Sequence, residues 1–125
     1  MNTEPRLITL PTLDHGDVTL PEPSWCIGHA DHRPDTYRVD LAHNAPVVPL
    51  TVRGRTIGRA VITQAPCAEL STREIQASVV LSYEGIDGFD PAGLYDFAAE
   101  LDTHADRLRA LADELTAILT GGTHR

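Results

Sequence analysis

Apolar residues near the C-terminus recur at alternating intervals of four and three positions, which is the pattern of a long amphipathic helix. Leucine occupies every seventh position, and another apolar residue follows each leucine four residues later: Leu94, Leu101, Leu108 and Leu115, then Ala98, Ala105, Ala112 and Leu119. Asp90 is a good N-cap, Pro91 suits the first helical position, and Gly121-Gly122 follows the last apolar residue. The pattern predicts one helix over residues 90–119.

The length of this helix raises the question of what covers its apolar seam. About 29 helical residues span roughly 43 Å, whereas a strand of about eight residues covers only ~27 Å. In one interpretation the seam lies across a sheet and closes the core. In the other, the end beyond about Ala105 extends past the sheet and packs on a second helix. We expect self-association, most simply a homodimer formed through helix 90–119.

Strand patterns precede the helix. Residues 46–52 and 56–64 flank Arg53-Gly54-Arg55, where Gly54 suits a tight hairpin turn. Pro49 places the first of these strands at a sheet edge or beside a bulge. A third strand over residues 74–85 shows the alternation of a half-buried strand at Ile75, Ala77, Val79, Leu81 and Tyr83. The pattern predicts an α+β fold, in which a small antiparallel sheet of three to four strands is packed by one long C-terminal helix.

The N-terminal part of the chain is less regular. A short strand is expected at residues 17–20, ended by Pro21 and Pro23, which lack the N–H that a sheet ladder requires. The predicted domain organisation is a flexible arm at 1–16, a single α+β domain at 17–119 and a disordered tail at 120–125. Within the domain lie an irregular Cys/His loop at 24–46, a β-meander at 47–85 and the helix at 90–119.

The irregular loop carries the candidate metal ligands. Cys26 and His29 have the C-x2-H spacing of one arm of a structural zinc site, and Gly28 between them favours a tight turn. His43 is the best candidate for the second arm, because it closes the loop just before the first clear strand. His32 is the fourth predicted ligand. The alternatives for that fourth position are Asp31, Asp35 and the distant Cys67.

The physical reason for a metal is the cost of ordering this loop. About twenty residues without periodicity have few apolar contacts to offset their lost conformational entropy. Zinc ligation coupled to folding supplies that free energy. The alternative interpretation is a polar surface loop in which Cys26 is buried beside Trp25.

The amino-acid composition limits the classes of molecule that this chain is expected to bind. The net charge of −8 disfavours nucleic-acid binding, which needs a basic face to neutralise phosphates. All ten basic residues are arginine, and the one cluster, Arg53, Arg55 and Arg59, is interpreted as a solvated hairpin tip. No apolar run approaches the ~20 residues of a membrane span, and no signal peptide is recognisable. We therefore expect a cytoplasmic protein whose two cysteines are thiols or metal ligands rather than a disulfide.

Catalytic motifs are missing from the sequence. It contains no H-E-x-x-H and no Gly-rich phosphate loop, and Cys67 is interpreted as a small buried hydrophobe. His104 is expected on the helix surface, where it has no functional role. The preferred hypothesis is a non-enzymatic, acidic interaction or regulatory module with a structural zinc and an unidentified protein partner. The alternative is a small zinc-dependent hydrolase with an open coordination position at Cys26, His29 and His43.

The segment Pro23-Ser24-Trp25-Cys26, together with His29 and His43 and the terminal stretch DPAGLYDFAAELDTHADRLRALADEL, resembles a known family. It is similar to small, uncharacterised actinobacterial (Streptomyces-type) proteins classed as a domain of unknown function. The resemblance covers residues 17–119 and leaves the N-terminal arm outside. It implies a short sheet, a closing Leu/Ala-rich helix and agreement at Cys26, His29 and His43. It implies no activity, cofactor or catalytic residue.

Overall fold

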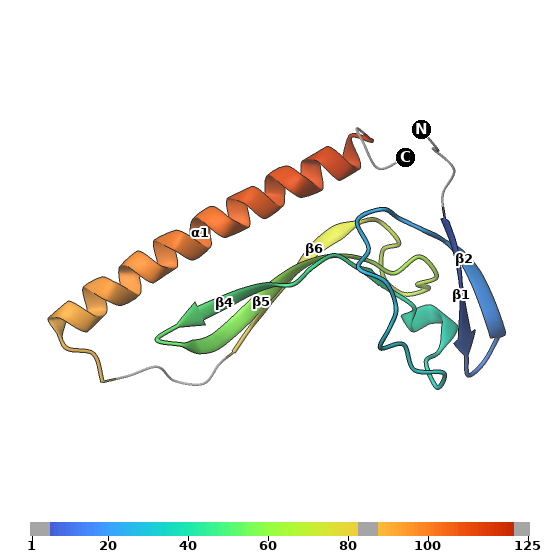
Figure 1. The fold of residues 1–125 in the computed structure, drawn as a ribbon, viewed down its shortest axis with the longest axis horizontal. Coiled ribbons are helices and arrows are strands. Elements are labelled where there is room, and N and C mark those ends of the chain that lie inside the picture. Colours follow the sequence, from blue (N-terminus) through green and yellow to red (C-terminus); the bar gives the residue numbers. More distant parts are fainter. Residues whose placement is uncertain (1–5, 83–87, 122–125) are drawn as a thin grey trace.

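In the computed structural model, which describes residues 6–82 and 88–121, the chain forms a four-stranded antiparallel sheet, a separate two-stranded hairpin and a long helix. The elements in chain order are β1 (Arg6–Thr12), β2 (Gly16–Glu22), the 3-10 helix η1 (Arg38–Asp40), β3 (His43–Asn44), β4 (Val48–Val52), β5 (Arg55–Gln64), β6 (Gln76–Leu81) and α1 (Pro91–Leu119). Figure 1 shows α1 along one face of the sheet and the β1–β2 hairpin far from the β4–β5 turn. The predicted α+β class is confirmed.

The central strand of the sheet is β5. It pairs antiparallel with β3 and β4 along one edge and with β6 along the other, so that Ala60 is opposite both Val48 and Val79. The predicted β4–β5 hairpin is confirmed, with Arg53 (φ 52°) and Gly54 (φ 76°) as its two-residue turn. Two successive positive φ values match the right-handed twist of the flanking strands.

The main core lies between the sheet and the helix. It consists of four buried residues, one directly after β3, two in β5 and one in α1: Ala45, Ala60, Ile62 and Leu111. Trp25 from the N-terminal loop packs against this cluster at its edge. The loop that carries the candidate metal ligands is therefore attached to the main core by an aromatic side chain.

The predicted ends of α1 are confirmed. The Asp90 carboxylate accepts a hydrogen bond of 2.7 Å from the Gly93 N–H, and Gly121 takes a positive φ of 73° just after the last turn. Residues 122–125 of the predicted tail and residues 83–85 of the predicted third strand lie outside the described residues.

The prediction that the helix end beyond Ala105 extends past the sheet is wrong. Leu108, Leu115 and Ile118, all beyond that position, pack against the core around Leu111. The helix is rotated so that the line through His104 and Leu111 faces the sheet. The repeating leucines and alanines therefore lie to one side of the contact between α1 and the sheet rather than at its centre.

The prediction that His104 lies on the helix surface is also wrong. Its ring is buried and contacts the backbone of Thr51, next to the register shift between Leu50 and Thr51 of β4. The Thr51 N–H donates to His104 Nε2 over 3.0 Å, and the Arg107 guanidinium lies 3.4 Å from Nδ1. His104 thus satisfies a backbone group that the bulge removes from the sheet ladder.

The N-terminal segment differs from the predicted arm at residues 1–16. Residues 6–12 form β1, which pairs with β2 in full register from Arg6 and Glu22 to Thr12 and Gly16. Pro21 lies inside β2 opposite Leu7 and does not end the strand. Both strands of a two-stranded hairpin are edges, so a proline whose missing N–H would face outward is tolerated.

Strand β6 is more exposed than the predicted half-buried strand over residues 74–85. Val79, Val80 and Leu81 are each about half exposed, and β6 forms the outer edge of the sheet beside β5. The close approach of these two strands depends on Gly58, because an added Cβ would overlap the Val80 carbonyl oxygen and lie 2.9 Å from Leu81 Cδ2.

We expect Gly58→Ala to lower the free energy of unfolding by about 2–3 kcal/mol, since the added methyl group forces the β5 and β6 backbones apart. Urea denaturation followed by circular dichroism measures this change. Ser78→Ala, a small change on β6 that adds no atom, is the control and should lie within about 0.5 kcal/mol of the wild type. Equal midpoints for all three proteins would contradict the close packing of β5 on β6.

Candidate metal centre

Four side chains with metal-binding atoms meet where the hairpin, the N-terminal loop and the sheet come together. Glu22 is the last residue of β2, and His43 is the first residue of β3, where it pairs with Gln64. Cys26 and His29 come from the loop between them. A hydrogen bond of 2.9 Å from the Ile27 N–H to the Asn44 carbonyl oxygen aligns this loop with β3.

The donor atoms of Glu22, Cys26, His29 and His43 all lie within 4.8 Å of one another. Glu22 Oε1 is 3.0 Å from His29 Nε2 and 2.9 Å from His43 Nδ1, and Cys26 Sγ is 3.7 Å from His29 Nε2. The side chains of Glu22, His29 and His43 are 6%, 9% and 2% exposed, while Cys26 is partly buried. The cluster is therefore shielded from solvent.

These separations resemble the edges of a zinc coordination tetrahedron. Bond lengths of about 2.0–2.1 Å to nitrogen or oxygen and about 2.3 Å to sulfur give edges of roughly 3.3 Å between N and O and roughly 3.6 Å between N and S. The Cys26–His29 distance of 3.7 Å matches the second value. The two contacts of Glu22 are a few tenths of an ångström shorter than the first, a difference that a small carboxylate rotation removes.

The ring orientation of His43 also fits a ligand. Its Nδ1 is only 2.9 Å from Glu22 Oε1, yet this buried nitrogen has no hydrogen bond of acceptable geometry. The separation alone therefore does not make a bond, because the ring axis at Nδ1 is not aimed at the carboxylate. A buried ring nitrogen without a partner is costly, and a metal ion bound at Nδ1 would satisfy it.

The ionisable groups of the cluster together carry one negative charge, which lies on the Glu22 carboxylate. Burial opposes ionisation of Glu22, but hydrogen bonds from Cys26 and His29 and the attraction between the carboxylate and the His29 and His43 rings outweigh it and lower the pKa of this carboxyl. Burial, together with the Glu22 carboxylate, raises the pKa of the Cys26 thiol. Burial lowers the pKa of His43 and keeps its ring neutral. A carboxylate and a neutral imidazole are the forms that bind zinc, and a bound cation would favour the thiolate.

Three of the four ligands predicted from the sequence, Cys26, His29 and His43, are brought together, but His32 is not. The His32 Nε2–H points instead to the Pro11 carbonyl oxygen at 2.8 Å and ties the loop to the hairpin. Glu22 takes the fourth place in the cluster. The alternatives Asp31, Asp35 and Cys67 are not part of it. Whether the four residues bind a metal stays a prediction.

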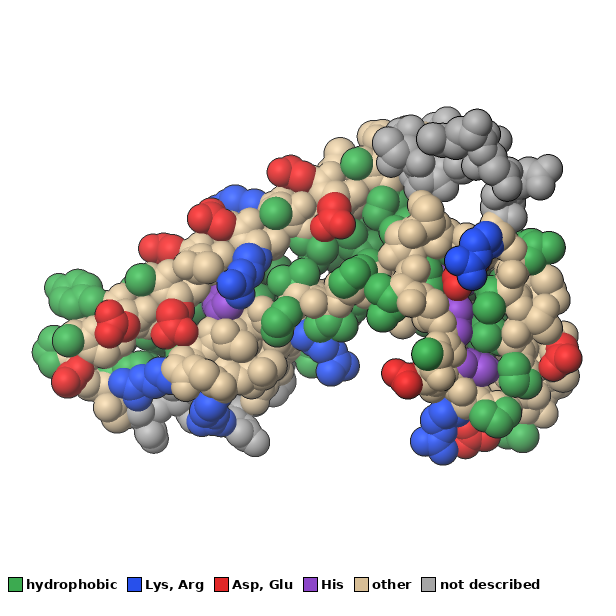
Figure 2. Space-filling model, viewed as in Figure 1, with side chains coloured by type: hydrophobic (Ala, Val, Ile, Leu, Met, Phe, Trp, Pro, Cys, Tyr) green, Lys and Arg blue, Asp and Glu red, His purple; other side chains and the backbone are tan. Residues whose placement is uncertain are grey.

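The hairpin and the loop form one unit, here called the N-terminal lobe (residues 6–44). The Leu13 N–H donates to the Thr36 carbonyl oxygen, and the Arg38 N–H donates to Asp14 Oδ1, each at 2.9 Å. The second bond lowers the pKa of Asp14. Figure 2 shows histidine side chains gathered in this lobe. Leu10 and Leu41 are its buried large apolar residues, so the lobe has little apolar core of its own.

The fold and the cluster define a small α+β domain with a candidate metal centre between a hairpin and a sheet. The family model for Domain of unknown function (DUF6907) matches residues 7–117, and the chain belongs to that family. The match begins inside β1, ten residues before the resemblance seen in the sequence. No curated protein and no solved structure matches the chain. Among the described residues, no helix has the length and apolar character needed to cross a bilayer.

Proposed function

We propose that this domain is a non-enzymatic protein-interaction or regulatory module whose N-terminal lobe is held by a zinc ion. In this proposal Glu22, Cys26, His29 and His43 are the ligands, and the domain self-associates through α1. The observation that carries the metal is the convergence of four donor atoms within 4.8 Å in a buried cluster. The buried Nδ1 of His43, which has no hydrogen bond, adds support.

The donor set favours zinc over other common ions. Calcium and magnesium prefer shells made only of oxygen, whereas this cluster offers one thiol, two imidazoles and one carboxylate. Four protein ligands complete a tetrahedral shell, as in structural zinc sites. The hydrolase alternative requires a water in the fourth position, which Glu22 would have to leave. The position of Glu22 therefore supports a structural role.

The architecture explains why the fold would use a metal here. The ligands come from the end of β2, from the loop and from the start of β3. A single ion would join the hairpin to the sheet at the place where apolar contacts are few. Structural zinc binding is worth about 10–16 kcal/mol in small peptides, enough to order such a lobe.

Elemental mass spectrometry of purified protein tests the zinc proposal. We expect about one zinc per chain in the wild type and in His32→Ala, but little in Cys26→Ala and His43→Ala. Glu22→Gln keeps the size of the side chain and removes its charge, so it should lower zinc occupancy more than His32→Ala does. Wild-type protein that is purified without chelator, contains no metal and takes up none when zinc is added would overturn the proposal.

The self-association is supported by the exposed side of α1. Leu94, Leu101 and Leu119 are 56%, 45% and 58% exposed, although they belong to the regular Leu/Ala pattern of the helix. Large leucines repeated on one exposed helix face are typical of helix–helix interfaces.

A further inference from the structure

Strand β6 leaves one edge of the sheet open. It pairs with β5 on one side only, and no other strand of the described residues pairs with its second side. The Ser82 N–H donates to the Ile57 carbonyl oxygen over 2.6 Å, so the backbone groups of Ser82 are directed toward β5. In an antiparallel ladder, successive residues direct their N–H and C=O groups to opposite sides of the strand. The backbone groups of Ala77, Val79 and Leu81 therefore point outward, away from β5.

The two edges of the sheet differ in how they are protected against further pairing. On the β4 edge, Pro49 lacks an N–H, and the ladder is irregular between Leu50 and Thr51. On the β6 edge, residues 76–81 contain no proline and no charged residue, and they pair with β5 without a register shift. Proteins commonly protect exposed edge strands with prolines, charges or bulges. A regular edge without these features indicates a strand that receives a partner.

Apolar side chains are exposed on both faces of this edge. Val79 and Val80 point to opposite faces and are both 50% exposed, and Leu81 is 54% exposed. Val79 is opposite the buried Ala60, so it lies on the face that α1 covers, while Val80 lies on the other face. In an interior strand, neighbours on both sides cover such side chains. Their exposure agrees with a missing strand beside β6.

The position of β6 relative to α1 follows from the direction and the chirality of the chain. Along α1, His104 contacts Thr51 beside the start of β5, and Leu111 then packs in one cluster with Ile62 near the end of β5. The helix and β5 therefore run in the same direction. In a strand of L-residues that runs away from the viewer, a residue whose side chain points up has its carbonyl group on the right. Ile62 points up to α1, and its carbonyl oxygen accepts from the Ala45 N–H, so β3 lies on the right and β6 on the left.

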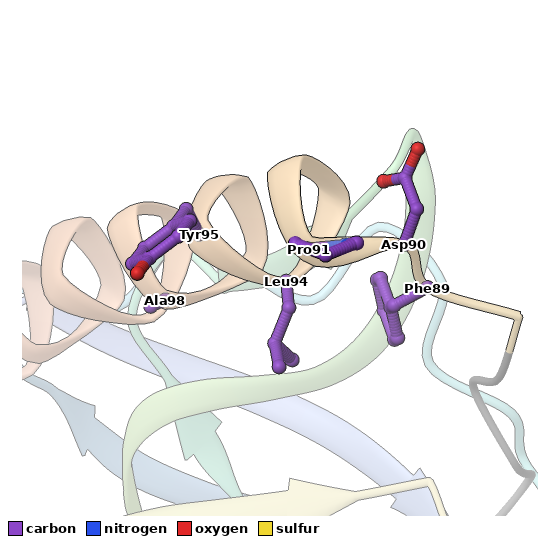
Figure 3. A pocket seen from close by; sticks show the side chains of 6 residues that line it. All are labelled: Phe89, Asp90, Pro91, Leu94, Tyr95 and Ala98. Carbon is purple, nitrogen blue, oxygen red and sulfur yellow. The ribbon is translucent and has the colours of Figure 1, made fainter.

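The exposed leucines of α1 lie on this same β6 side. A right-handed helix turns clockwise as it runs away from the viewer, so residues about 80–100° past the downward Leu111 point left. Three exposed leucines have this position: Leu94, Leu101 and Leu119. Leu94 also lines, with Phe89, an open hollow of about 490 Å³ at the start of the helix (Figure 3). One side of the molecule thus combines an open strand edge with exposed leucines above it.

We propose that two copies of this chain pair through β6 across a two-fold axis at Val79, so that their two four-stranded sheets become one continuous antiparallel sheet. Val79 then lies opposite Val79 of the other copy, and Ala77 lies opposite Leu81. This register uses every outward-directed residue of β6, and each opposed pair exchanges two backbone hydrogen bonds. A second copy fits this side because it supplies both a matching strand edge and a helix with exposed leucines. The inference rests on the proposed self-association and adds β6, the orientation and the register.

The two copies fit side by side without overlap. A two-fold axis perpendicular to the sheet keeps both helices on one face and makes them antiparallel. Each α1 contacts β4, β5 and β6 and lies over β5, so the two helices are three strand spacings, or about 14 Å, apart. This separation exceeds the ~8–10 Å between packed helices and leaves room for the leucine side chains of both copies. Because β6 carries no charge, the edges of two acidic chains meet without direct repulsion.

Disulfide cross-linking between copies tests the register. In Val79→Cys, the two substituted residues lie opposite each other with Cα atoms about 5.5 Å apart, which suits a disulfide. Val80→Cys is the matched control, because Val80 is equally exposed but its two Cα atoms are about 8 Å apart, too far for a disulfide. Under mild oxidation, Val79→Cys should form a disulfide between copies and Val80→Cys should form none. A mixture of Ala77→Cys and Leu81→Cys should join position 77 to position 81. Peptide mass spectrometry identifies the joined residues, and the wild type controls for the native cysteines.

Val79→Pro tests the strand edge by light scattering. The Val79 N–H points outward, so proline removes no hydrogen bond to β5 but blocks pairing with a second copy. We expect the dimer mass to be lost while the circular dichroism spectrum stays that of the wild type. Val79→Ala keeps the N–H and should keep the dimer mass. If Val79→Pro unfolds, the cross-linking of Val79→Cys still decides.

The outcomes separate this inference from the proposed self-association. A wild-type dimer in which Val79→Cys forms no more disulfide than Val80→Cys would place the interface elsewhere and overturn this inference alone. A folded, dimeric Val79→Pro protein would do the same. A disulfide formed by Ala77→Cys alone would show a different register and overturn the one proposed. A monomeric wild type would overturn both the inference and the proposed self-association.

Discussion

Removal of the proposed zinc by a chelator, or replacement of His43 by alanine, is expected to unfold the N-terminal lobe and leave the sheet and α1 folded. The lobe contains few buried apolar side chains, chiefly Leu10 and Leu41, whereas β5 and α1 share a core around Ile62 and Leu111. A metal contribution of about 10–16 kcal/mol exceeds anything that two leucines supply. Hydrogen exchange should show that amides of residues 6–44 lose protection while those of β5 and α1 keep it.

Two controls separate the loss of metal from simple damage to the lobe. His32→Ala removes the hydrogen bond to the Pro11 carbonyl but no member of the cluster, so it should cost about 1 kcal/mol and leave protection largely unchanged. Adding chelator to His43→Ala should change nothing further, because the metal is already lost. If chelated wild-type protein kept the protection of residues 6–44, the lobe would be held without a metal.

The candidate site was partly predictable because two of its members are close in the sequence. Cys26 and His29 are linked by local spacing, and His43 follows from the need to close the loop before the first clear strand. The sequence does not point to Glu22, because Pro21 predicts that the strand ends at Leu20 and leaves Glu22 outside any element. In the structure Glu22 is the buried end of β2. A buried glutamate at the end of a strand, four residues before a cysteine, was the available signal.

The fold could be predicted where a sequence pattern extends over many residues. It could not be predicted where tertiary contacts determine how an element is oriented. The ends of α1 follow from Asp90, Pro91 and Gly121, which act locally. The rotation of the helix about its axis does not follow from local residues, because the side of α1 that faces the sheet includes a polar residue, His104. The partner of His104 is the bulged backbone at Thr51. Its burial could not be expected without knowing where the bulge lies.

Replacement of Leu101 by glutamate is expected to convert the proposed dimer into a monomer without unfolding the domain. Leu101 is 45% exposed and lies on the same exposed side of α1 as Leu94 and Leu119, so the substitution places a charge in each half of the proposed interface. Two unpaired charges that cost about 1.5 kcal/mol each would weaken association about 100-fold. Light scattering should change from about 27 kDa, which is twice 13.6 kDa, to the mass of one chain.

Thr103→Glu is the matched control, since it adds the same charge to the opposite, exposed side of the same helix. It should keep the dimer mass, and the circular dichroism spectra of both variants should match that of the wild type. A Leu101→Glu protein that remained dimeric would exclude this side of α1 as the interface. Loss of the dimer in both variants would instead point to a general effect of negative charge on this acidic chain, which has a net charge of −8. Only the loss confined to Leu101→Glu assigns the interface to this side of α1.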